Sequence, residues 1–397
     1  MLLRQQERQT RAHRRAVGSF AFAASCALAL TILGAQAAGA AVPDAIFADG
    51  YEGFAPARLI VHYPAAAHFI SVRGDGGGLS FAQGKTLART GNTFTTILEV
   101  AAPAAWIPLL DDATFAIGGN YSVAPGQTVE IWPHFTTMQG QVITLIAAFH
   151  STVLDNTRAI YAYLPPTYIE NTEATLPVVY MHDGQNLWAA HPEWALGGVT
   201  WQVDTAFDNA ANNGTFKEAI VIGVESNSNR IYEYTPTVDP DVQAGGGADS
   251  YLQMLVQELK PAVDGMLRTR IDTSSTLMAG SSLGGLVTAY AGRTKPTVFG
   301  RIAALSPSAW WDSEVIVSEV QTTPAAPNRP LLVYVDSGDS AAENAADVNA
   351  LAAAYVSVGY MEGTDLLHVV QPGGQHNETY WAQRFPGAML FLLGPRD

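Results

Sequence analysis

The sequence holds a single cysteine among its 397 residues. Cys26 lies in an apolar stretch near the start of the chain, so the remaining residues can form no disulfide, catalytic thiol or thiolate metal site. There is also no His-Glu-x-x-His motif and no Asp-rich calcium loop. We therefore expect no metal and no cofactor, and a stability that comes from the hydrophobic core.

Positive charge is also scarce. Lys and Arg number 21 against 36 Asp and Glu, which gives a formal net charge of −15. Such an acidic surface repels phosphate backbones, so nucleic acid is not an expected partner. Apolar residues make up 48% of the chain and charged residues 14%. These values are typical of a globular protein with a sizeable core, and the length suits two domains.

Residues 1–40 have the pattern of a secretory signal peptide. Five arginines precede an apolar run over residues 17–33, and small residues follow it. This order predicts cleavage near residues 37–41, a periplasmic or secreted protein, and no stable membrane insertion afterwards. A retained membrane anchor is the alternative, because the apolar run is long enough to span a bilayer. Residues 41–57 are small and acidic with Pro and Gly, which suggests a linker.

Residues 58–136 have the texture of an all-β module. Short apolar or alternating runs are separated by Gly-rich turns, as in a small sandwich. The module loosely resembles the β-sandwich modules that precede catalytic domains in carbohydrate-active enzymes. That resemblance implies carbohydrate binding, in which Trp106 and Trp132 would stack on sugar. The alternative places both indoles in the core.

From residue 137 to residue 397 apolar strands and helical segments alternate. This alternation predicts an α/β fold with a mostly parallel sheet and helices on both faces. Ligands of such sheets bind at the carboxyl ends of the strands. Motifs that follow strands in this half of the chain are therefore the candidates for chemistry.

The stretch AGSSLGGL at residues 279–286 follows an apolar strand and opens a helical segment. A strand–turn–helix nucleophile motif has glycines two residues before and two residues after its serine. Gly280 and Gly284 flank Ser282 in this way, whereas Ser281 has no such flanks. Ser282 is therefore the predicted nucleophile. A chance Gly- and Ser-rich loop is the alternative.

A nucleophilic serine needs a base, and in this fold the acid and then the histidine follow the serine along the chain. His368 and His376 are the histidines that come after Ser282. His368 lies within a strand, where a structural role is common. His376 lies in a Gly-rich loop after the last strand, which is the place expected for a general base.

The acid is less clearly determined by the pattern. Asp336, Asp339 and Glu343 follow one another around the end of the strand LLVYVDSG. Asp336 lies within the strand, Asp339 at its exit and Glu343 at the start of a helix. We favour Glu343 and keep Asp339 as the alternative. Glu343 could also serve only as the glutamate of a capping box with Ser340.

Two backbone N–H groups should stabilise a developing oxyanion. One is predicted at Leu283, directly after the nucleophile, and the other at Gln185 in the loop HDGQNLW. An ordinary turn is the alternative for this loop. We expect Arg230 and Glu233 either to pair with each other or to contact substrate. Three tryptophans in predicted loops should shape or pack the mouth of the site: Trp188, Trp311 and Trp381.

Taken together, the motifs over residues 138–397 resemble an esterase family. They are LPVVYMHDGQNLW, NSNRIYEYTP, GGGADSYLQMLVQELKP, MAGSSLGGL, LSPSAWW and GGQHNETYW. The family includes enterochelin, feruloyl and acetylxylan esterases, esterase D and the mycobacterial mycolyltransferases. The resemblance implies an α/β-hydrolase fold and a cofactor-free triad, with Ser282 as nucleophile, His376 as base, and the amides of Leu283 and Gln185 around the oxyanion.

The triad acid is where the chain departs from many relatives. They place it in a Gly-x-x-Asp or Gly-x-x-Glu turn, but here Ala341 stands three residues after Gly338. An acid beside Asn at a helix start, as in the mycolyltransferases, matches Glu343-Asn344.

We thus expect a secreted serine esterase that hydrolyses carboxylic esters, with acyl groups on carbohydrate as one candidate substrate class. An acyltransferase with the same triad and a non-catalytic carbohydrate-binding protein are the alternatives.

Overall fold

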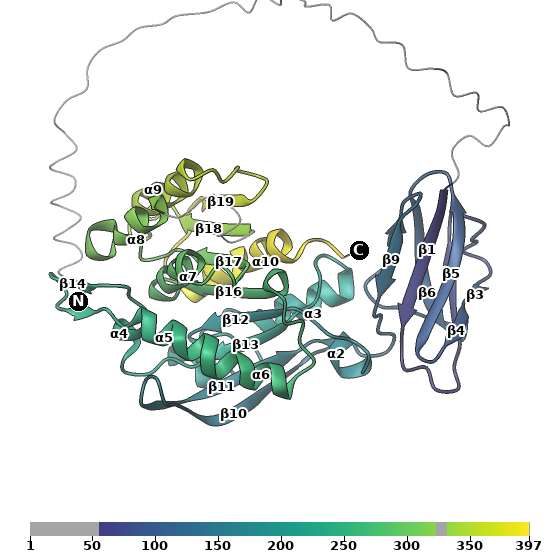
Figure 1. The fold of residues 1–397 in the computed structure, drawn as a ribbon, viewed down its shortest axis with the longest axis horizontal. Coiled ribbons are helices and arrows are strands. Elements are labelled where there is room, and N and C mark those ends of the chain that lie inside the picture. Colours follow the sequence, from purple (N-terminus) through teal and green to yellow (C-terminus); the bar gives the residue numbers. More distant parts are fainter. Residues whose placement is uncertain (1–54, 323–331, 397) are drawn as a thin grey trace, which may run out of the picture. The chain divides into compact units, whose positions relative to one another are not determined.

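The computed structural model describes residues 55–322 and 332–396 (Figure 1). The predicted signal peptide, residues 1–40, lies outside these residues, as does most of the predicted linker. The last three linker residues, 55–57, belong to the first strand. Within the described ranges, no helix combines the length and apolar character needed to cross a membrane.

The first half of the structure is a β-sandwich of short strands. One sheet has the order β4-β5-β1-β9, and the other has the order β3-β2-β6-β7 with β8 paired to β6. The strands are β1 (Ala55–His62), β2 (Ile70–Gly74), β3 (Lys85–Thr86), β4 (Ala88–Thr90), β5 (Thr93–Val100), β6 (Ala104–Leu110), β7 (Thr114–Phe115), β8 (Tyr121–Val123) and β9 (Thr128–Ile131).

Alternation along these strands explains why two sheets form. In β1, Ala57, Leu59 and Val61 are fully buried while their neighbours face outward. Inward side chains of both sheets make one apolar cluster, in which Trp106 is completely buried. The core interpretation of Trp106 is therefore correct, and the sugar-stacking interpretation is wrong for this residue.

The second half is built on an eight-stranded sheet with the order β10-β11-β13-β12-β16-β17-β18-β19. The pairs β10–β11 and β11–β13 are antiparallel, and the pairs from β13 to β19 are parallel. The strands are β10 (Gln141–Ser151), β11 (Asn156–Leu164), β12 (Val178–His182), β13 (Ile220–Val224), β16 (Thr276–Ser281), β17 (Arg301–Leu305), β18 (Leu332–Gly338) and β19 (Leu366–Gln371). This is the α/β-hydrolase fold, so the predicted fold class is confirmed.

Helices cover both faces of this sheet. The helices are α2 (Pro166–Glu170), α3 (Val203–Asn213), α4 (Arg230–Glu233), α5 (Ala248–Met254), α6 (Lys260–Met266), α7 (Leu283–Thr294), α8 (Trp311–Gln321), α9 (Ala345–Ser357) and α10 (Glu378–Leu393). A π-helical segment, Leu255–Leu259, joins α5 to α6. It lies just before Pro261, which has no N–H to continue the α-helical hydrogen bonds. A two-stranded hairpin, β14 (Val238–Asp239) and β15 (Ala244–Gly245), precedes α5.

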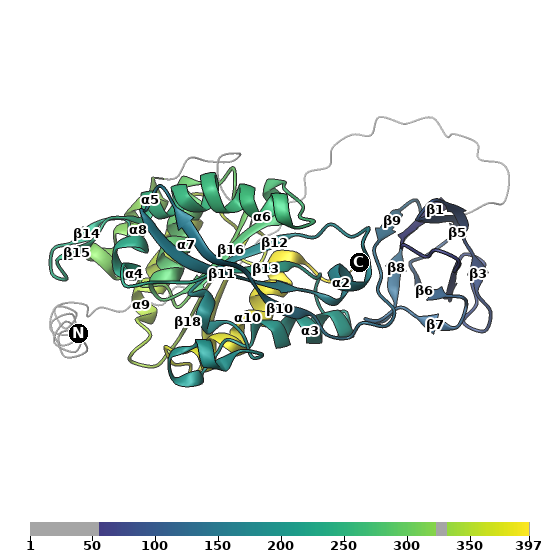
Figure 2. The ribbon, with the colours of Figure 1, turned by 90° about the horizontal axis from the view of Figure 1, so that it is seen from below.

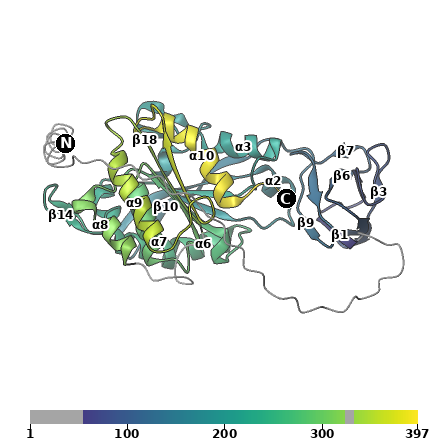
Figure 3. The same cartoon turned by 90° about the horizontal axis from the view of Figure 1, so that it is seen from above.

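Two separate apolar clusters show which helix covers which face. Residues of α5, α7, α8 and α9 pack in one cluster, and residues of α3 and α10 pack in the other. The turned views in Figures 2 and 3 show α3 and α10 on one side of the sheet and α6 and α7 on the other. The central strands β12, β13 and β16 are buried at every position, as expected for strands between two helical layers.

Candidate active site

Ser282 lies in the sharp turn between β16 and α7. Its φ of 55° and ψ of −123° are strained for a residue with a side chain, and its carbonyl accepts from Leu286 in the first turn of α7. The turn needs a glycine at position 280. A Cβ there would lie 2.7 Å from the His182 ring and 2.8 Å from the Gly284 backbone. The sequence motif therefore corresponds to a crowded turn that holds the Ser282 side chain at the carboxyl edge of the sheet.

Ser308 is the hydrogen-bond partner of this hydroxyl, and the sequence pattern did not single it out. The two Oγ atoms are 3.4 Å apart, and the Ser308 N–H donates to the Ser282 carbonyl at 2.9 Å. Ser308 follows β17, the strand next to β16. Its place after a neighbouring parallel strand was the signal that could have identified it.

His376 and Glu343 meet on the same edge of the sheet. The Nδ1 atom of His376 is 3.2 Å from Oε2 of Glu343. Glu343 is 1% exposed, whereas the histidine side chain is partly open to solvent. Burial acts to raise the pKa of Glu343, but hydrogen bonds from His376 and Ser306 and the charge of Arg384 outweigh it and lower the pKa. The glutamate therefore stays ionised beside the imidazole.

The other acid candidates have different partners. Asp339 accepts a hydrogen bond from the Gly373 N–H at 2.7 Å and makes no contact with His376. Asp336 is fully buried within β18, where Arg384 lies 3.0 Å from it. Burial raises the pKa of Asp336 to about 6, although Arg384, Tyr334 and the Ser306 N–H act to lower it.

The capping-box alternative for Glu343 is wrong. Helix α9 begins at Ala345, and Asn344 is its N-cap with a φ of 51°. Glu343 precedes the cap, and its own N–H donates to the Ser340 carbonyl. The left-handed Asn344 turns the chain so that the Glu343 side chain points away from the helix start, toward His376.

Arg384 organises the buried side of this acid–histidine pair. Besides Asp336, it donates to Ser306 Oγ at 2.6 Å and to Gln371 Oε1 at 2.8 Å, and it lies 3.6 Å from Glu343. The Trp381 indole N–H donates to the same Ser306 oxygen at 3.1 Å. Arg384 is an almost buried cation inside a mostly apolar helix, α10. That unusual placement was its only sequence signal.

The two predicted oxyanion donors are both at starts of helical turns. Leu283 is the first residue of α7, and Gln185 is the second residue of the one-turn 3₁₀ helix Gly184–Asn186. N–H groups at these positions have no acceptor within their own helix. The Gln185 side chain is itself held in place by two hydrogen bonds with Ser226, at 2.8 and 3.1 Å.

A cavity of about 540 Å³ opens beside Ser282. Gln185 and Ser226 contribute to its wall. Aromatic and apolar side chains form another part of the wall, namely Trp194, Ala195, Leu196, Trp201 and Trp381. The charged residues in its lining are Asp183, Glu193, Arg230 and Glu378. The cavity thus combines a broad apolar surface with a few polar groups, as small-molecule sites usually do.

Arg230 and Glu233 do not pair with each other, so the pairing alternative was wrong. Arg230 makes a two-pronged ion pair with Asp183, at 2.7 and 2.8 Å, and lines the cavity. Glu233 is buried and pairs with Arg158 at 2.8 Å. One turn of helix, α4, points the two side chains to different partners.

The three tryptophans also divide. Trp381 lies in α10, lines the cavity, and its ring lies 5.1 Å edge-on from His376. Trp188 and Trp311 are fully buried in the two apolar clusters and pack the fold instead. Trp194 and Trp201, which no sequence motif singles out, line the cavity. His368 lies in β19, where burial lowers its pKa.

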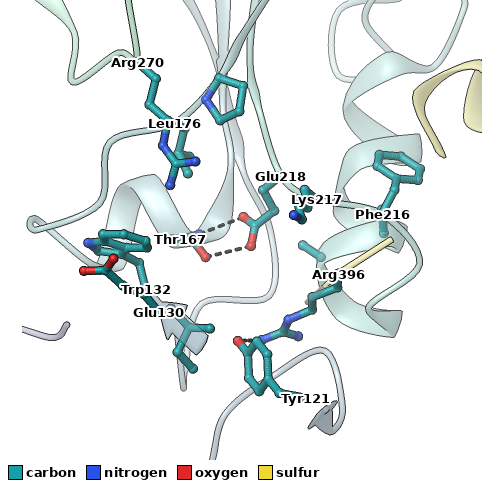
Figure 4. A pocket seen from close by; sticks show the side chains of 14 residues that line it. Tyr121, Glu130, Trp132, Thr167, Leu176, Phe216, Lys217, Glu218, Arg270 and Arg396 are labelled. Carbon is teal, nitrogen blue, oxygen red and sulfur yellow. Dashed lines mark hydrogen bonds between the residues drawn. The ribbon is translucent and has the colours of Figure 1, made fainter. Parts of the chain in front are cut away.

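A second cavity, of about 410 Å³, shares no lining residue with the cavity beside Ser282, and Figure 4 shows the side chains that line it. Its lining includes Trp132, Glu218 and Arg270, and Glu218 accepts two hydrogen bonds from Thr167. The Trp132 ring stacks on His62 at 4.9 Å, and the Arg270 guanidinium lies 5.3 Å from the ring centre. The indole therefore already has two partners within the protein.

Comparison with known proteins points in the same direction as the geometry. Residues 151–392 match the model of the Esterase family, described as "Putative esterase". The chain is 24% identical over 250 residues to the uncharacterized protein YbbA of Bacillus subtilis, which covers 60% of this chain and 93% of that protein. It is 27% identical over 233 residues to an iron(III) salmochelin esterase of Escherichia coli O6:H1, which covers 58% of this chain and 50% of that protein.

Among solved structures, an IroE-like serine hydrolase from Shewanella oneidensis has the same fold. The match has a TM-score of 0.50 and 23% identity, and it covers 64% of this chain and 80% of that one.

Proposed function

The chain belongs to this esterase family and is a carboxylic ester hydrolase, and we propose that it acts as a serine esterase through Ser282, His376 and Glu343. The observation that carries the proposal is the joint placement of a strained serine turn and an acid–histidine pair at one edge of the sheet. Ser282, His376 and Glu343 would supply the nucleophile, the base and the buried orienting acid that this chemistry needs.

In the proposed mechanism the Ser282 oxygen attacks the ester carbonyl carbon and passes its proton to Nε2 of His376. Glu343 bonds the opposite ring nitrogen, Nδ1, so it holds the imidazole in one tautomer and stabilises the imidazolium. The N–H groups of Leu283 and Gln185 would bind the oxyanion. His376 then protonates the departing alcohol, and water, activated by the same imidazole, releases the acid and regenerates Ser282.

The proposal requires the Ser282 hydroxyl to exchange Ser308 for His376 as its partner. Its 3.4 Å hydrogen bond with Ser308 is long and weak. In substrate-free enzymes the hydrogen bond between nucleophile and base is often long or misaligned, and it tightens only when substrate is bound. Ser308 would then keep the serine oriented while the site is empty.

We further propose that residues 1–40 direct secretion and that the esterase half begins near residue 137, after a β-rich module. Acyl groups on carbohydrate are the substrate class that such a module suits. The name of the E. coli relative points instead to a siderophore ester. In either case a cavity of about 540 Å³ could receive only part of the substrate.

The decisive experiment compares wild type with Ser282→Ala on p-nitrophenyl acetate, p-nitrophenyl butyrate, methyl ferulate and a catecholate siderophore ester. We expect wild type to cleave at least one ester and the variant to lose roughly 10³-fold or more of that turnover. Ser281→Ala is the matched control. It removes the hydroxyl of the neighbouring serine, which belongs to β16 and not to the turn that carries Ser282. Equal activity of wild type and Ser282→Ala would overturn the proposal.

A further inference from the structure

An apolar side chain stands fully in solvent at the rim of the cavity beside Ser282. Leu196 is 98% exposed, more than any other large apolar residue in the described ranges, and yet it belongs to the cavity lining. Isolated exposed apolar residues are common and need no explanation. Leu196 differs because it belongs to the lining of the cavity beside Ser282, next to Trp194 and Ala195.

The loop that carries Leu196 is held firmly at its base. Trp194 is stacked between two rings: its centroid is 4.0 Å from that of His191 at 6° and 4.4 Å from that of Tyr161 at 21°. Glu193 bonds His191 at 2.9 Å, and Tyr161 belongs to β11 of the central sheet. Stacked pairs of this kind add stability beyond simple burial. The loop is therefore anchored to the fold.

The tip of the loop is shaped by a turn that needs glycine. Gly197 and Gly198 have φ values of 79° and 72°, a region that side chains rarely adopt. The Gly198 N–H closes the turn on the Ala195 carbonyl at 3.1 Å. This geometry presents Leu196 at the outside of the turn, with no protein side chain covering it.

We propose that Leu196 is a specificity-determining residue that contacts an apolar part of the ester where the substrate extends out of the cavity. The proposal rests on the proposed esterase function and narrows its substrate class to esters with an apolar chain or ring beyond the reacting carbonyl. The bound substrate would cover the Leu196 side chain, and Trp194 and Ala195 would lie on the protein side of it. Small esters that stay within the cavity would not reach it.

The test uses three simple esters in a pH-stat assay: ethyl acetate, ethyl hexanoate and hexyl acetate. Ethyl acetate has no long chain, ethyl hexanoate has a long acyl chain, and hexyl acetate has a long alcohol chain. The comparison therefore tests whether Leu196 contacts the acyl side or the alcohol side of the ester. We expect Leu196→Ser to lower kcat/KM about tenfold for at least one of the two esters that carry a six-carbon chain, and less than about twofold for ethyl acetate. Leu196→Met, which keeps an apolar side chain, should retain the wild-type preference.

Val199→Ser is the matched control. Val199 is 47% exposed in the same loop but lies outside the Ser282 cavity, so all three rates should stay as in wild type. Equal losses on all three esters, or no loss on any, would overturn the role of Leu196 while leaving the esterase function intact. Wild-type enzyme that cleaves neither these three esters nor any member of the broader panel would overturn both proposals.

Discussion

The two halves of the structure differ in where they place charge. Among the described residues up to Ile131, Ser71 is the only buried polar side chain, and the ion pair Arg73–Asp112 is partly open to solvent. The α/β half instead buries several charges, among them Arg158 with Glu233 and Arg384 with Asp336. Burying an ion costs desolvation free energy, so a buried ion pair adds little stability compared with apolar packing. The described α/β half thus carries buried charges of a kind that the sandwich lacks.

Both buried pairs are linked through contacts to the candidate site residues. Arg384 lies behind Glu343 and His376. Arg158 lies over the ring of Tyr251, whose hydroxyl is 2.9 Å from His182, and His182 packs under the Gly280 turn. The sandwich has no comparable network, so its residues can serve as controls for those of the α/β half.

The largest expected effect comes from the acid that orients His376. Glu343→Gln keeps the side-chain shape but removes the negative charge, so the imidazole loses its fixed tautomer and its counter-charge. We expect kcat to fall by about 10³- to 10⁴-fold, with KM little changed. Steady-state kinetics on the best ester of the panel measures both values.

Asp339→Asn is the control for Glu343→Gln, because Asp339 bonds Gly373 and does not contact His376. We expect its kcat to stay within about threefold of wild type, as is usual for residues that touch neither substrate nor base. If Asp339→Asn were the inactive variant, the acid would have to be reassigned.

The next effect is on stability. Arg158→Met leaves Glu233 as an unpaired carboxylate at a site where both side chains are almost completely buried. We expect the free energy of unfolding to drop by about 3–5 kcal/mol, measured by guanidinium denaturation. In the double variant Arg158→Met/Glu233→Leu much of this loss should be recovered, because no charge is left buried. A double variant that is less stable than the single one would show that the pair itself stabilises the fold.

A pH dependence should distinguish His182. Burial lowers the pKa of His182 to about 3 from a usual 6.5, so the folded protein holds it neutral while the unfolded chain binds a proton. The contribution of neutral His182 to the free energy of unfolding is fully present above about pH 6.5. It is lost as the pH falls toward 3, and the loss reaches roughly 2 kcal/mol at pH 5. His182→Asn should remove this part of the acid dependence, whatever its stability at pH 7.

Denaturation curves between pH 7 and pH 5 measure the His182 effect. His150→Asn, which replaces an exposed histidine in the same half of the structure, is the control for the loss of a histidine side chain as such. Identical slopes for wild type and His182→Asn would contradict the prediction.

The smallest effect is expected in the sandwich. Arg73→Met removes an ion pair of 3.0 Å that solvent already screens. The midpoint of guanidinium denaturation should therefore shift far less than it does for Arg158→Met. A shift of the midpoint as large as that of Arg158→Met would show that ion pairs contribute equally to stability in the two halves.

Local patterns predicted the elements and the main candidates well. Apolar runs located the strands of the central sheet, the Gly-x-Ser-x-Gly spacing located the Ser282 turn, and the Gly-rich loop located His376. Glu343 was preferred over Asp339, and the structure brings Glu343, not Asp339, next to His376. These features depend on a few consecutive residues, so the sequence carries them directly.

Pairings between distant side chains could not be read in this way. Arg230 and Glu233 were near each other in sequence, yet they bind Asp183 and Arg158 instead. Trp188 and Trp194 lie six residues apart, but one is buried in the core and the other lines the cavity. Which way each side chain points depends on the turn or helix that carries it and on what packs against it.

The sequence by itself therefore determined the fold class, the strained serine turn and the position of the candidate base, because hydrophobic period and glycine spacing act locally. The tertiary structure decided the partners: Ser308 beside Ser282, Arg384 behind Glu343, and the anchored loop that exposes Leu196. Those contacts join strands and helices that are 26 to 41 residues apart along the chain or belong to different layers. Their geometry exists only once the sheet has assembled and brought the carboxyl ends of its strands together.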